Sequence, residues 1–249
     1  MDRSGSTLHT RLVPAARVHA VVPAAGRGLR FGGTLSKQFE SIAGRPLLAW
    51  TVERLLAAGV DSVTVALPSD VAVAPPDWLA DPRICTVAGG DSRQESVTAA
   101  LAASPAEGRD LVLVHDGARP ALAAADLLAV CQAALSADGA VLGRGASDTL
   151  KLVEQGVIVG TVDRSRVFRA ETPQVFRREL LERAIEAALA VGFTATDEAS
   201  LVERFPGMRV LAVEAVAPNP KLTTPADLPL VRALLEGFGA LPDSSGAGR

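Results

Sequence analysis

Short apolar runs alternate with longer segments of helical periodicity along most of this chain. The runs are four to eight residues long and several are rich in valine, which is typical of buried strands. They predict strands at 18–22, 62–67, 84–87, 111–114, 139–143 and 208–215. The segments between and after them predict helices at 46–59, 92–103, 124–135, 177–192, 196–205 and 223–237. This alternation indicates βαβ units and an α/β fold, with a mostly parallel sheet covered by helices on both faces.

The helix predicted at 46–59 carries its own start and stop signals. Pro46 stands where a helix tolerates proline, and Gly59 follows the last residue of the periodic pattern. Leu48, Val52 and Leu55 fall on one face at helical spacing, so this face is expected to pack on the sheet.

The alternation breaks at 148–176, where the period is closer to two and Gly156 and Gly160 are turn residues. We expect a protruding antiparallel β-arm there rather than another βαβ unit. No linker divides the rest, so we expect one domain at 18–237, a flexible extension at 1–17 and a flexible tail at 238–249.

Composition excludes several classes of function. The 249 residues are 48% hydrophobic and 21% charged, which indicates a folded globular chain. A net charge of −3, an absence of tyrosine and only 4% aromatic residues disfavour a nucleic-acid-binding surface. Cys85 and Cys131 cannot build a disulfide framework, and no apolar window is long enough to span a membrane or serve as a secretory signal. A cytoplasmic protein is therefore expected.

The stretch "PAAGRGLRFGGTLSKQ" at 23–38 follows the first predicted strand and is rich in glycine. Phe31 occupies the last glycine position of the dinucleotide fingerprint, and Thr34 stands where a P-loop needs lysine. What remains is a glycine turn with Arg30 and Lys37, whose backbone N–H groups and cations suit a phosphate chain. A glycine-rich surface loop with solvated cations is the alternative.

A second candidate is "VLVHDGARP" at 112–120. Asp116 follows a buried strand and is close in sequence to Gly117 and Arg119. In a parallel sheet, ligands bind outside the carboxyl ends of strands, so Asp116 could take Mg²⁺ or a sugar hydroxyl. A simple Asp–Gly turn is the alternative.

Three further segments are weaker on their own. "GGDSRQES" at 89–96 could line a base pocket or be a turn with a helix cap, and Lys221 could be a ligand or a surface lysine. The arm is rich in arginine, which also suits an exposed charged hairpin. The histidines lack metal-ligand spacing, and His115 is more consistent with packing at a strand end.

Taken together, these segments resemble the 2-C-methyl-D-erythritol 4-phosphate cytidylyltransferase family of the non-mevalonate isoprenoid pathway. The similarity runs from about Val18 to Leu230. Eight motifs carry it, in the family's order: "VVPAAGRGLRF", "SKQF", "GGDSRQESV", "VHDGARP", "DTLK", "TVDRSRVFRAETPQVF", "TDEASLVE" and "NPKLTTPADL". Each motif is weak alone, whereas the ordered set is specific.

The resemblance implies a Rossmann-like three-layer α/β/α nucleotidyltransferase domain and a reaction of CTP with methylerythritol phosphate. The substrate phosphate would attack the α-phosphorus of CTP in line, helped by Mg²⁺ and fixed cations, without a protein nucleophile. The resemblance also implies a homodimer in which the arm crosses to the partner subunit.

The family pattern assigns roles to individual residues. Arg30, Lys37 and Lys221 would act on the phosphates as catalytic residues. Residues implied in CTP binding are Pro23, Ala24, Ala25, Gly26, Gly28, Gly90, Asp91, Ser96 and Gly117. Residues implied in binding the polyol phosphate are Asp116, Arg119, Thr149, Arg164 and Thr172, and Asp116 is also the possible Mg²⁺ ligand.

One departure from the family pattern is Ser36, where a proline often precedes the Lys-Gln pair. Proline would stiffen that loop by fixing φ, so serine could loosen Lys37 without removing a charge. Three rival functions stay open. They are a cytidylyltransferase for another polyol phosphate such as ribitol 5-phosphate, an inactive nucleotide-binding regulatory subunit and, disfavoured by Phe31, a nicotinamide dehydrogenase.

Overall fold

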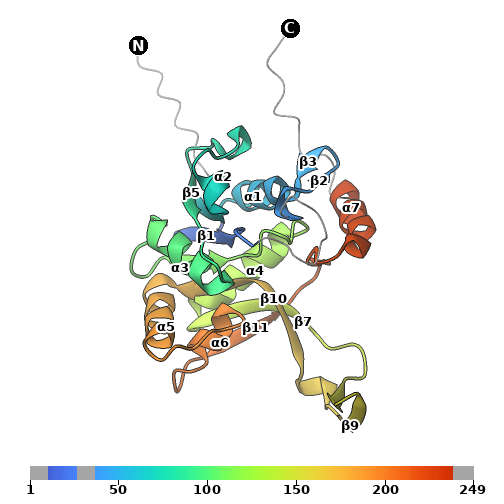
Figure 1. Ribbon diagram of the computed structural model, residues 1–249. Coiled ribbons are helices and arrows are strands. Elements are labelled where there is room, and N and C mark those ends of the chain that lie inside the picture. The colour runs from blue at the N-terminus through green and yellow to red at the C-terminus, as the bar shows by residue number, and fades with distance from the viewer. Residues whose placement is uncertain (1–10, 27–36, 238–249) are drawn as a thin grey trace, which may run out of the picture.

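The computed structural model describes residues 11–26 and 37–237 (Figure 1). Its main sheet contains β1 (Val18–Pro23), β4 (Ser62–Leu67), β5 (Ile84–Ala88), β6 (Leu111–Val114), β7 (Gly139–Gly145), β10 (Phe168–Arg177) and β11 (Val210–Glu214). The strand order is β11-β7-β10-β6-β1-β4-β5. All neighbours pair in parallel except β10, which is antiparallel to both β6 and β7. The predicted mostly parallel sheet is confirmed.

Helices cover both faces of this sheet. They are α1 (Leu47–Ala57), α2 (Ser69–Ala72), α3 (Arg93–Ala103), α4 (Ala124–Leu135), α5 (Arg178–Ala190), α6 (Glu198–Val202) and α7 (Leu228–Gly237). Neighbouring residues of β1 point to opposite faces, so Val22 packs in one apolar cluster with α1 and α4, whereas Val21 packs in another with α3, α5 and α6. This arrangement is the predicted α/β/α sandwich.

The signals at the ends of α1 act as predicted. Pro46 is the N-cap residue, and Gly59, just past the C-cap, has a φ of +92°. Glycine adopts this left-handed conformation without strain, so the helix can stop there and the chain can turn into β4.

A third, smaller apolar cluster joins α7 to the start of α1. It contains Ile42, Leu47, Trp50, Ala118, Leu222, Val231 and Leu235. Ile42 comes from the short antiparallel pair β2 (Ser41–Ile42) and β3 (Arg45–Pro46). Because Ala118 follows β6 and Leu222 precedes α7, this cluster, hereafter the α7 cluster, fixes two loops against each other.

The arm protrudes from the body as a two-stranded hairpin (Figure 1). Its strands are β8 (Lys151–Glu154) and β9 (Val157–Thr161), and Gln155 and Gly156 form the turn with positive φ. The expected range of 148–176 is too long for the protruding part, because β10 enters the main sheet between β6 and β7.

The first described residues pack against the domain. Val13 is buried in the core, and the Leu12 amide donates to the Gly59 carbonyl at 2.9 Å. The expected extension and tail lie mostly outside the described residues, so the division of the chain at 17 and 237 stays a prediction. Within the described residues, no helix is both long and apolar enough to cross a membrane.

Candidate active site

Most of the predicted site residues that the structure describes lie at the carboxyl ends of β1, β5 and β6 or contact residues there. β1 lies between β4 and β6, and the chain passes from β1 to β4 on one side before it returns to β6 on the other. The carboxyl ends of β1 and β6 are therefore a topological switch point, where ligands bind in folds of this kind. Ala24 continues β1 here, and its amide donates to the Ala66 carbonyl at 2.8 Å.

Gln38 braces the start of the glycine-rich turn. Its side chain is buried, and its Nε2 donates to the carbonyl oxygens of Ala24 and Gly26, the second at 2.9 Å. The "SKQF" motif is thus tied back to the end of β1. Of the residues predicted in this segment, Gly28, Arg30 and Ser36 lie outside the described residues, as does the Lys37 side chain.

Two glycines in the turn at 89–91 are tightly packed. Gly89 lies against the end of β1, and Gly90 lies against the start of α3. A Cβ on Gly89 would lie 2.4 Å from Ala25 Cβ, and one on Gly90 would lie 2.3 Å from Glu95 Cβ. Both separations are far below normal contact, so these glycines are required by packing. The turn therefore places Gly89 against the predicted residue Ala25, and Gly90 is the next residue along the chain.

The helix after this turn begins with a reciprocal cap. The Glu95 amide donates to Ser92 Oγ, and the Ser92 amide donates to Glu95 Oε2 at 2.9 Å. Ser96 is buried and its hydroxyl donates to the Ser92 carbonyl at 2.9 Å, whereas Asp91 is exposed. Gly90 and Asp91 thus lie in the turn, and Ser96, on α3, is hydrogen-bonded to the turn backbone.

Asp116, two residues after β6, meets three cationic side chains. Its Oδ2 lies 2.8 Å from Lys221 Nζ and 3.7 Å from Arg119 Nε, and its Oδ1 accepts from Arg93 Nε at 3.3 Å. Burial alone would raise the pKa of Asp116, but Arg93, Lys221 and Arg119 outweigh it and hold that pKa well below its usual range. The carboxylate is therefore ionised at neutral pH.

Thr172 fixes the backbone of the same loop. Its hydroxyl accepts a hydrogen bond from the Asp116 amide at 3.0 Å and lies 3.1 Å from His115 Nδ1. It reaches this position from β10, where the pairing with β7 is irregular between Ala170 and Gln174. His115 is fully buried, and burial lowers its pKa to about 4, so it is neutral and structural as expected.

The segment containing Lys221 is hydrogen-bonded to the loop after β6. The Leu222 amide donates to the Ala118 carbonyl at 2.9 Å, and Arg119 Nη1 donates to the Asn219 carbonyl at 2.6 Å. Gly117 is tightly enclosed, since a Cβ there would lie 3.0 Å from Leu48 Cδ1. Asp116, Arg119, Thr172 and Lys221 are consequently one contiguous group, hereafter the Asp116 cluster.

The two predicted residues on the arm stand apart from the Asp116 cluster. Thr149 and Arg164 are exposed, and Arg164 Nη1 donates to the Ser147 carbonyl at 2.6 Å. No contact recorded between described residues joins either of them to Asp116, Arg119 or Lys221.

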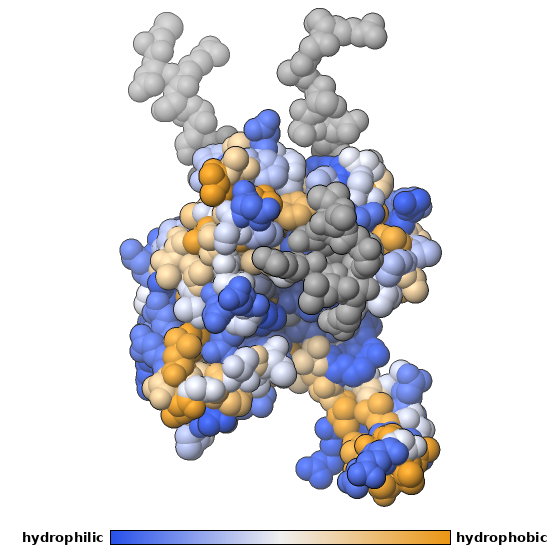
Figure 2. All heavy atoms as spheres, viewed as in Figure 1, coloured by the Kyte–Doolittle hydropathy of each residue, from blue (hydrophilic) through white to orange (hydrophobic). Residues whose placement is uncertain are grey.

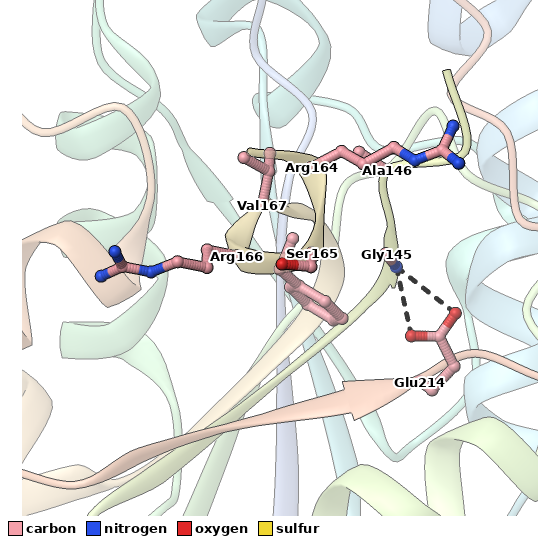
Figure 3. Close-up of a pocket in the computed structure, with 8 residues that line it drawn as sticks. Gly145, Ala146, Arg164, Ser165, Arg166, Val167 and Glu214 are labelled. Carbon is pink, nitrogen blue, oxygen red and sulfur yellow. Dashed lines mark hydrogen bonds between the residues drawn. The ribbon is translucent and has the colours of Figure 1, made fainter. Parts of the chain in front are cut away.

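Arg164 instead borders an open hollow of about 550 Å³ at the base of the arm (Figure 3). Figure 3 shows the Arg164 and Arg166 side chains pointing in opposite directions there, while Glu214 accepts from the Gly145 amide. This hollow contains none of the residues of the Asp116 cluster.

Comparison with known proteins identifies the family of this chain. Residues 18–237 match the family described as IspD, 2-C-methyl-D-erythritol 4-phosphate cytidylyltransferase. The chain belongs to this family. Proteins of that name from Xanthomonas campestris pv. campestris strain 8004 and Aeromonas hydrophila subsp. hydrophila are 46% and 44% identical, over 85% and 87% of this chain and 82% and 89% of theirs.

Solved structures of cytidylyltransferases share the fold. The 2-C-methyl-D-erythritol 4-phosphate cytidylyltransferase from Thermus thermophilus aligns with a TM-score of 0.75 and 34% identity, over 88% of this chain and 99% of that chain. The Francisella tularensis protein aligns with a TM-score of 0.78 and 28% identity, over 88% and 100%. Both the resemblance stated from the motifs and the expected nucleotidyltransferase fold are confirmed.

The described part of this cytidylyltransferase-family chain holds no preformed metal cage. Within residues 11–26 and 37–237, no group of three or more His, Cys, Asp or Glu side chains could hold a metal ion. Mg²⁺ at nucleotide sites is usually held by one or two carboxylates together with substrate phosphates. The ionised Asp116 fits that pattern, so the site suits a Mg²⁺ that arrives with a triphosphate.

Four residues near the site were not singled out from the sequence. Gln38 braces the glycine turn, Asn219 Nδ2 donates to the Thr172 carbonyl at 3.0 Å, and Arg93 contacts both Asp116 and Glu198. All four lie within the motifs that carry the resemblance. What the sequence did not indicate is their pairing, which joins residues up to 105 positions apart.

Proposed function

We propose that this chain transfers the cytidylyl group of CTP to 2-C-methyl-D-erythritol 4-phosphate, giving 4-diphosphocytidyl-2-C-methyl-D-erythritol and pyrophosphate. The observation that carries the proposal is the ionised carboxylate of Asp116, which lies among three cations at the switch point of the sheet. A phosphate oxygen of the acceptor bonds to the α-phosphorus of CTP, the bond to the β-phosphate breaks in line, and pyrophosphate leaves.

The chain needs to supply positive charge rather than a nucleophile for this reaction. Two polyanionic substrates must approach each other, and the charge that develops around the α-phosphorus must be stabilised. Arg30 and Lys37 are assigned to the triphosphate by the family pattern. Lys221, which is 38% exposed in its side chain, reaches the phosphates from the opposite side.

We assign the choice of CTP over other nucleotides to two glycine turns, the one after β1 and the one at 89–91. Ala24, Ala25, Gly90, Asp91 and Ser96 are assigned to the cytosine, and the close contact of Gly89 with Ala25 joins the two turns that carry these residues. The family pattern assigns Pro23 and Gly117 to the ribose, and Gly26 and Gly28 belong to the glycine turn that we assign to the phosphates.

Asp116 is the proposed carboxylate ligand of Mg²⁺, with Arg119 beside it for the acceptor. When bound, Mg²⁺ neutralises phosphate charge and polarises the reacting phosphate. Asp116 would supply the negative charge that holds the ion in place. The Thr172 hydroxyl fixes the backbone of Asp116 by accepting a hydrogen bond from the Asp116 amide.

The arm supports a proposal of a homodimer. Five apolar side chains are 51–63% exposed on it: Leu152, Val153, Val157, Ile158 and Val159. Figure 2 shows this apolar surface on the protruding hairpin. A second copy of the chain would bury it and would receive Thr149 and Arg164 next to its own Asp116 cluster, whereas Thr172 acts within its own chain.

Subunit mixing tests the shared site. Arg164→Ala and Lys37→Ala homodimers should each be inactive, but a hybrid dimer has one site with both residues intact. An equal mixture should regain about a quarter of wild-type activity by random pairing. If labelled subunits exchange and activity does not return, Arg164 does not act in the partner's site.

The acceptor is tested by pyrophosphate release. Purified protein with CTP and Mg²⁺ should release pyrophosphate with 2-C-methyl-D-erythritol 4-phosphate and much less with ribitol 5-phosphate. Preference for ribitol 5-phosphate would establish the alternative cytidylyltransferase, and no release with either acceptor would favour a regulatory nucleotide-binding role.

Location and domain division are also proposals. Both cysteines are free, with Cys131 buried and Cys85 exposed, which suits a reducing cytoplasm. We assign residues 18–237 to one catalytic domain, because the family match covers that range.

A further inference from the structure

Arg93 and Glu198 form a two-pronged ion pair beside the Asp116 cluster. Arg93 Nη1 lies 2.6 Å from Glu198 Oε1, and Nη2 lies 3.0 Å from Oε2. Arg93 is the first residue of α3 and Glu198 the first residue of α6, so the pair joins the starts of two helices. Glu198 is only 2% exposed, and a buried charge of this kind is retained only with a good partner.

The third nitrogen of the same guanidinium is directed at the site. Arg93 Nε donates to Asp116 Oδ1 at 3.3 Å. One planar guanidinium therefore joins two buried carboxylates. Its two terminal nitrogens donate to Glu198, and its Nε donates to Asp116. A lysine ammonium lacks this planar geometry and cannot reproduce the arrangement.

Arg93 and Lys221 hold Asp116 in different ways. Lys221 pairs with Oδ2 through a flexible side chain, and the proposed reaction requires it to contact phosphate. Arg93 is fixed by Glu198 and keeps its contact with Oδ1. Asp116 thus retains one immobile cation while Lys221 acts on the substrates.

Arg93 also links Asp116 to the nucleotide-binding turn. It directly follows Ser92, the N-cap residue that closes the 89–92 turn onto α3. A displacement of Arg93 would consequently change the position of Asp116 relative to the bound nucleotide.

We propose that Arg93, clamped by Glu198, is a positioning residue for cytidylyl transfer that orients Asp116 toward the reacting phosphates. The inference rests on the proposed function. Arg93 acts through Asp116 and is not itself assigned to the nucleotide. Its loss therefore lowers turnover more than it weakens CTP binding, because the residues that bind CTP remain.

The first test compares Arg93→Lys with wild type in the pyrophosphate assay with CTP and 2-C-methyl-D-erythritol 4-phosphate. We expect kcat to fall at least about tenfold, as misplacement of a catalytic group typically causes, while the CTP Kd measured by calorimetry changes less than about threefold. Arg83→Lys is the matched control, since Arg83 makes a similar two-pronged pair with Asp81 at the amino end of β5. It should leave both values unchanged.

A double-mutant cycle separates positioning from a general structural role. If Arg93 acts through Asp116, Arg93→Lys combined with Asp116→Asn should lose no more kcat than Asp116→Asn alone. Multiplied losses, or a kcat of Arg93→Lys close to wild type, would overturn the inference.

Glu198→Gln provides a second route should Arg93→Lys fail to fold. Glutamine has nearly the same shape as glutamate but no charge, so it weakens the hold on Arg93. This variant should also have a lower kcat than wild type, with an unchanged CTP Kd. Normal turnover in this variant overturns the inference, whereas a wild-type protein that releases no pyrophosphate rejects the proposed function itself.

Discussion

Asp116 has three cationic neighbours, although the chain as a whole carries a net charge of −3. The positive charge at the site is therefore local, because the fold brings cations from distant segments around one buried carboxylate. The overall charge disfavours a nucleic-acid-binding surface but does not indicate where the Asp116 cluster lies. Asp116 and Arg119 follow β6 and Arg93 begins α3, so the fold brings these three side chains together beyond the carboxyl end of β6.

His19, near the amino-terminal end of β1, is buried, and its burial affects the stability of the fold. Its Nδ1 lies 2.8 Å from Ser62 Oγ, and burial lowers its pKa from 6.5 although Asp110 opposes this. The unfolded chain therefore binds a proton more readily than the folded chain once the pH falls below about 6.5. Burial lowers the pKa of His115 to about 4, so this group acts in the same direction.

We predict that the folded chain loses stability as the pH falls from about 7.5 to about 5.5, because burial lowers the pKa of both histidines relative to the unfolded chain. The urea midpoint of unfolding at the two pH values measures this. His19→Gln should show a smaller decrease than wild type. An equal or higher wild-type midpoint at the lower pH would contradict the assignment.

At the scale of elements, the sequence pattern located most strands and helices because burial imposes clear periods. β4, β6 and α4 have the bounds expected from the pattern, and the ends of α1 follow from Pro46 and Gly59. β10 was misjudged as part of the arm. Its period of two is the same in a hairpin and in a central strand, so the sequence could not indicate that it pairs with β6 and β7.

The α7 cluster leads to an element-scale prediction. Leu222 is fully buried there and its amide is bonded to the Ala118 carbonyl, so it anchors the segment that carries Lys221. Leu222→Ala should lower the free energy of unfolding by about 2–5 kcal/mol through the cavity that it leaves. Denaturant unfolding followed by tryptophan fluorescence measures this, since Trp50 lies in the same cluster.

Leu230→Ala is the control for this prediction, because Leu230 lies on α7 but is 53% exposed. It should change the free energy of unfolding by less than about 0.5 kcal/mol. Equal effects of the two substitutions would show that the α7 cluster does not anchor this segment.

At the scale of the whole molecule, the site unites segments from Ala24 to Lys221. The motifs identified most of its members, but their contacts depend on the order of the strands and on pairs such as Arg93 with Glu198, 105 positions apart. A cation at a helix start usually faces solvent, so nothing in the sequence pattern paired Arg93 with a buried carboxylate. In the proposed homodimer, Thr149 and Arg164 would complete the site of the partner subunit.

The most direct test of the account is pyrophosphate release by wild type and Asp116→Asn with CTP, Mg²⁺ and 2-C-methyl-D-erythritol 4-phosphate. Wild type should release pyrophosphate only when both substrates are present. Asp116→Asn should remain folded and lose at least about 100-fold in kcat, the scale seen when one preorganised electrostatic group is removed. A folded Asp116→Asn protein with wild-type turnover would contradict the placement of the reaction at the Asp116 cluster.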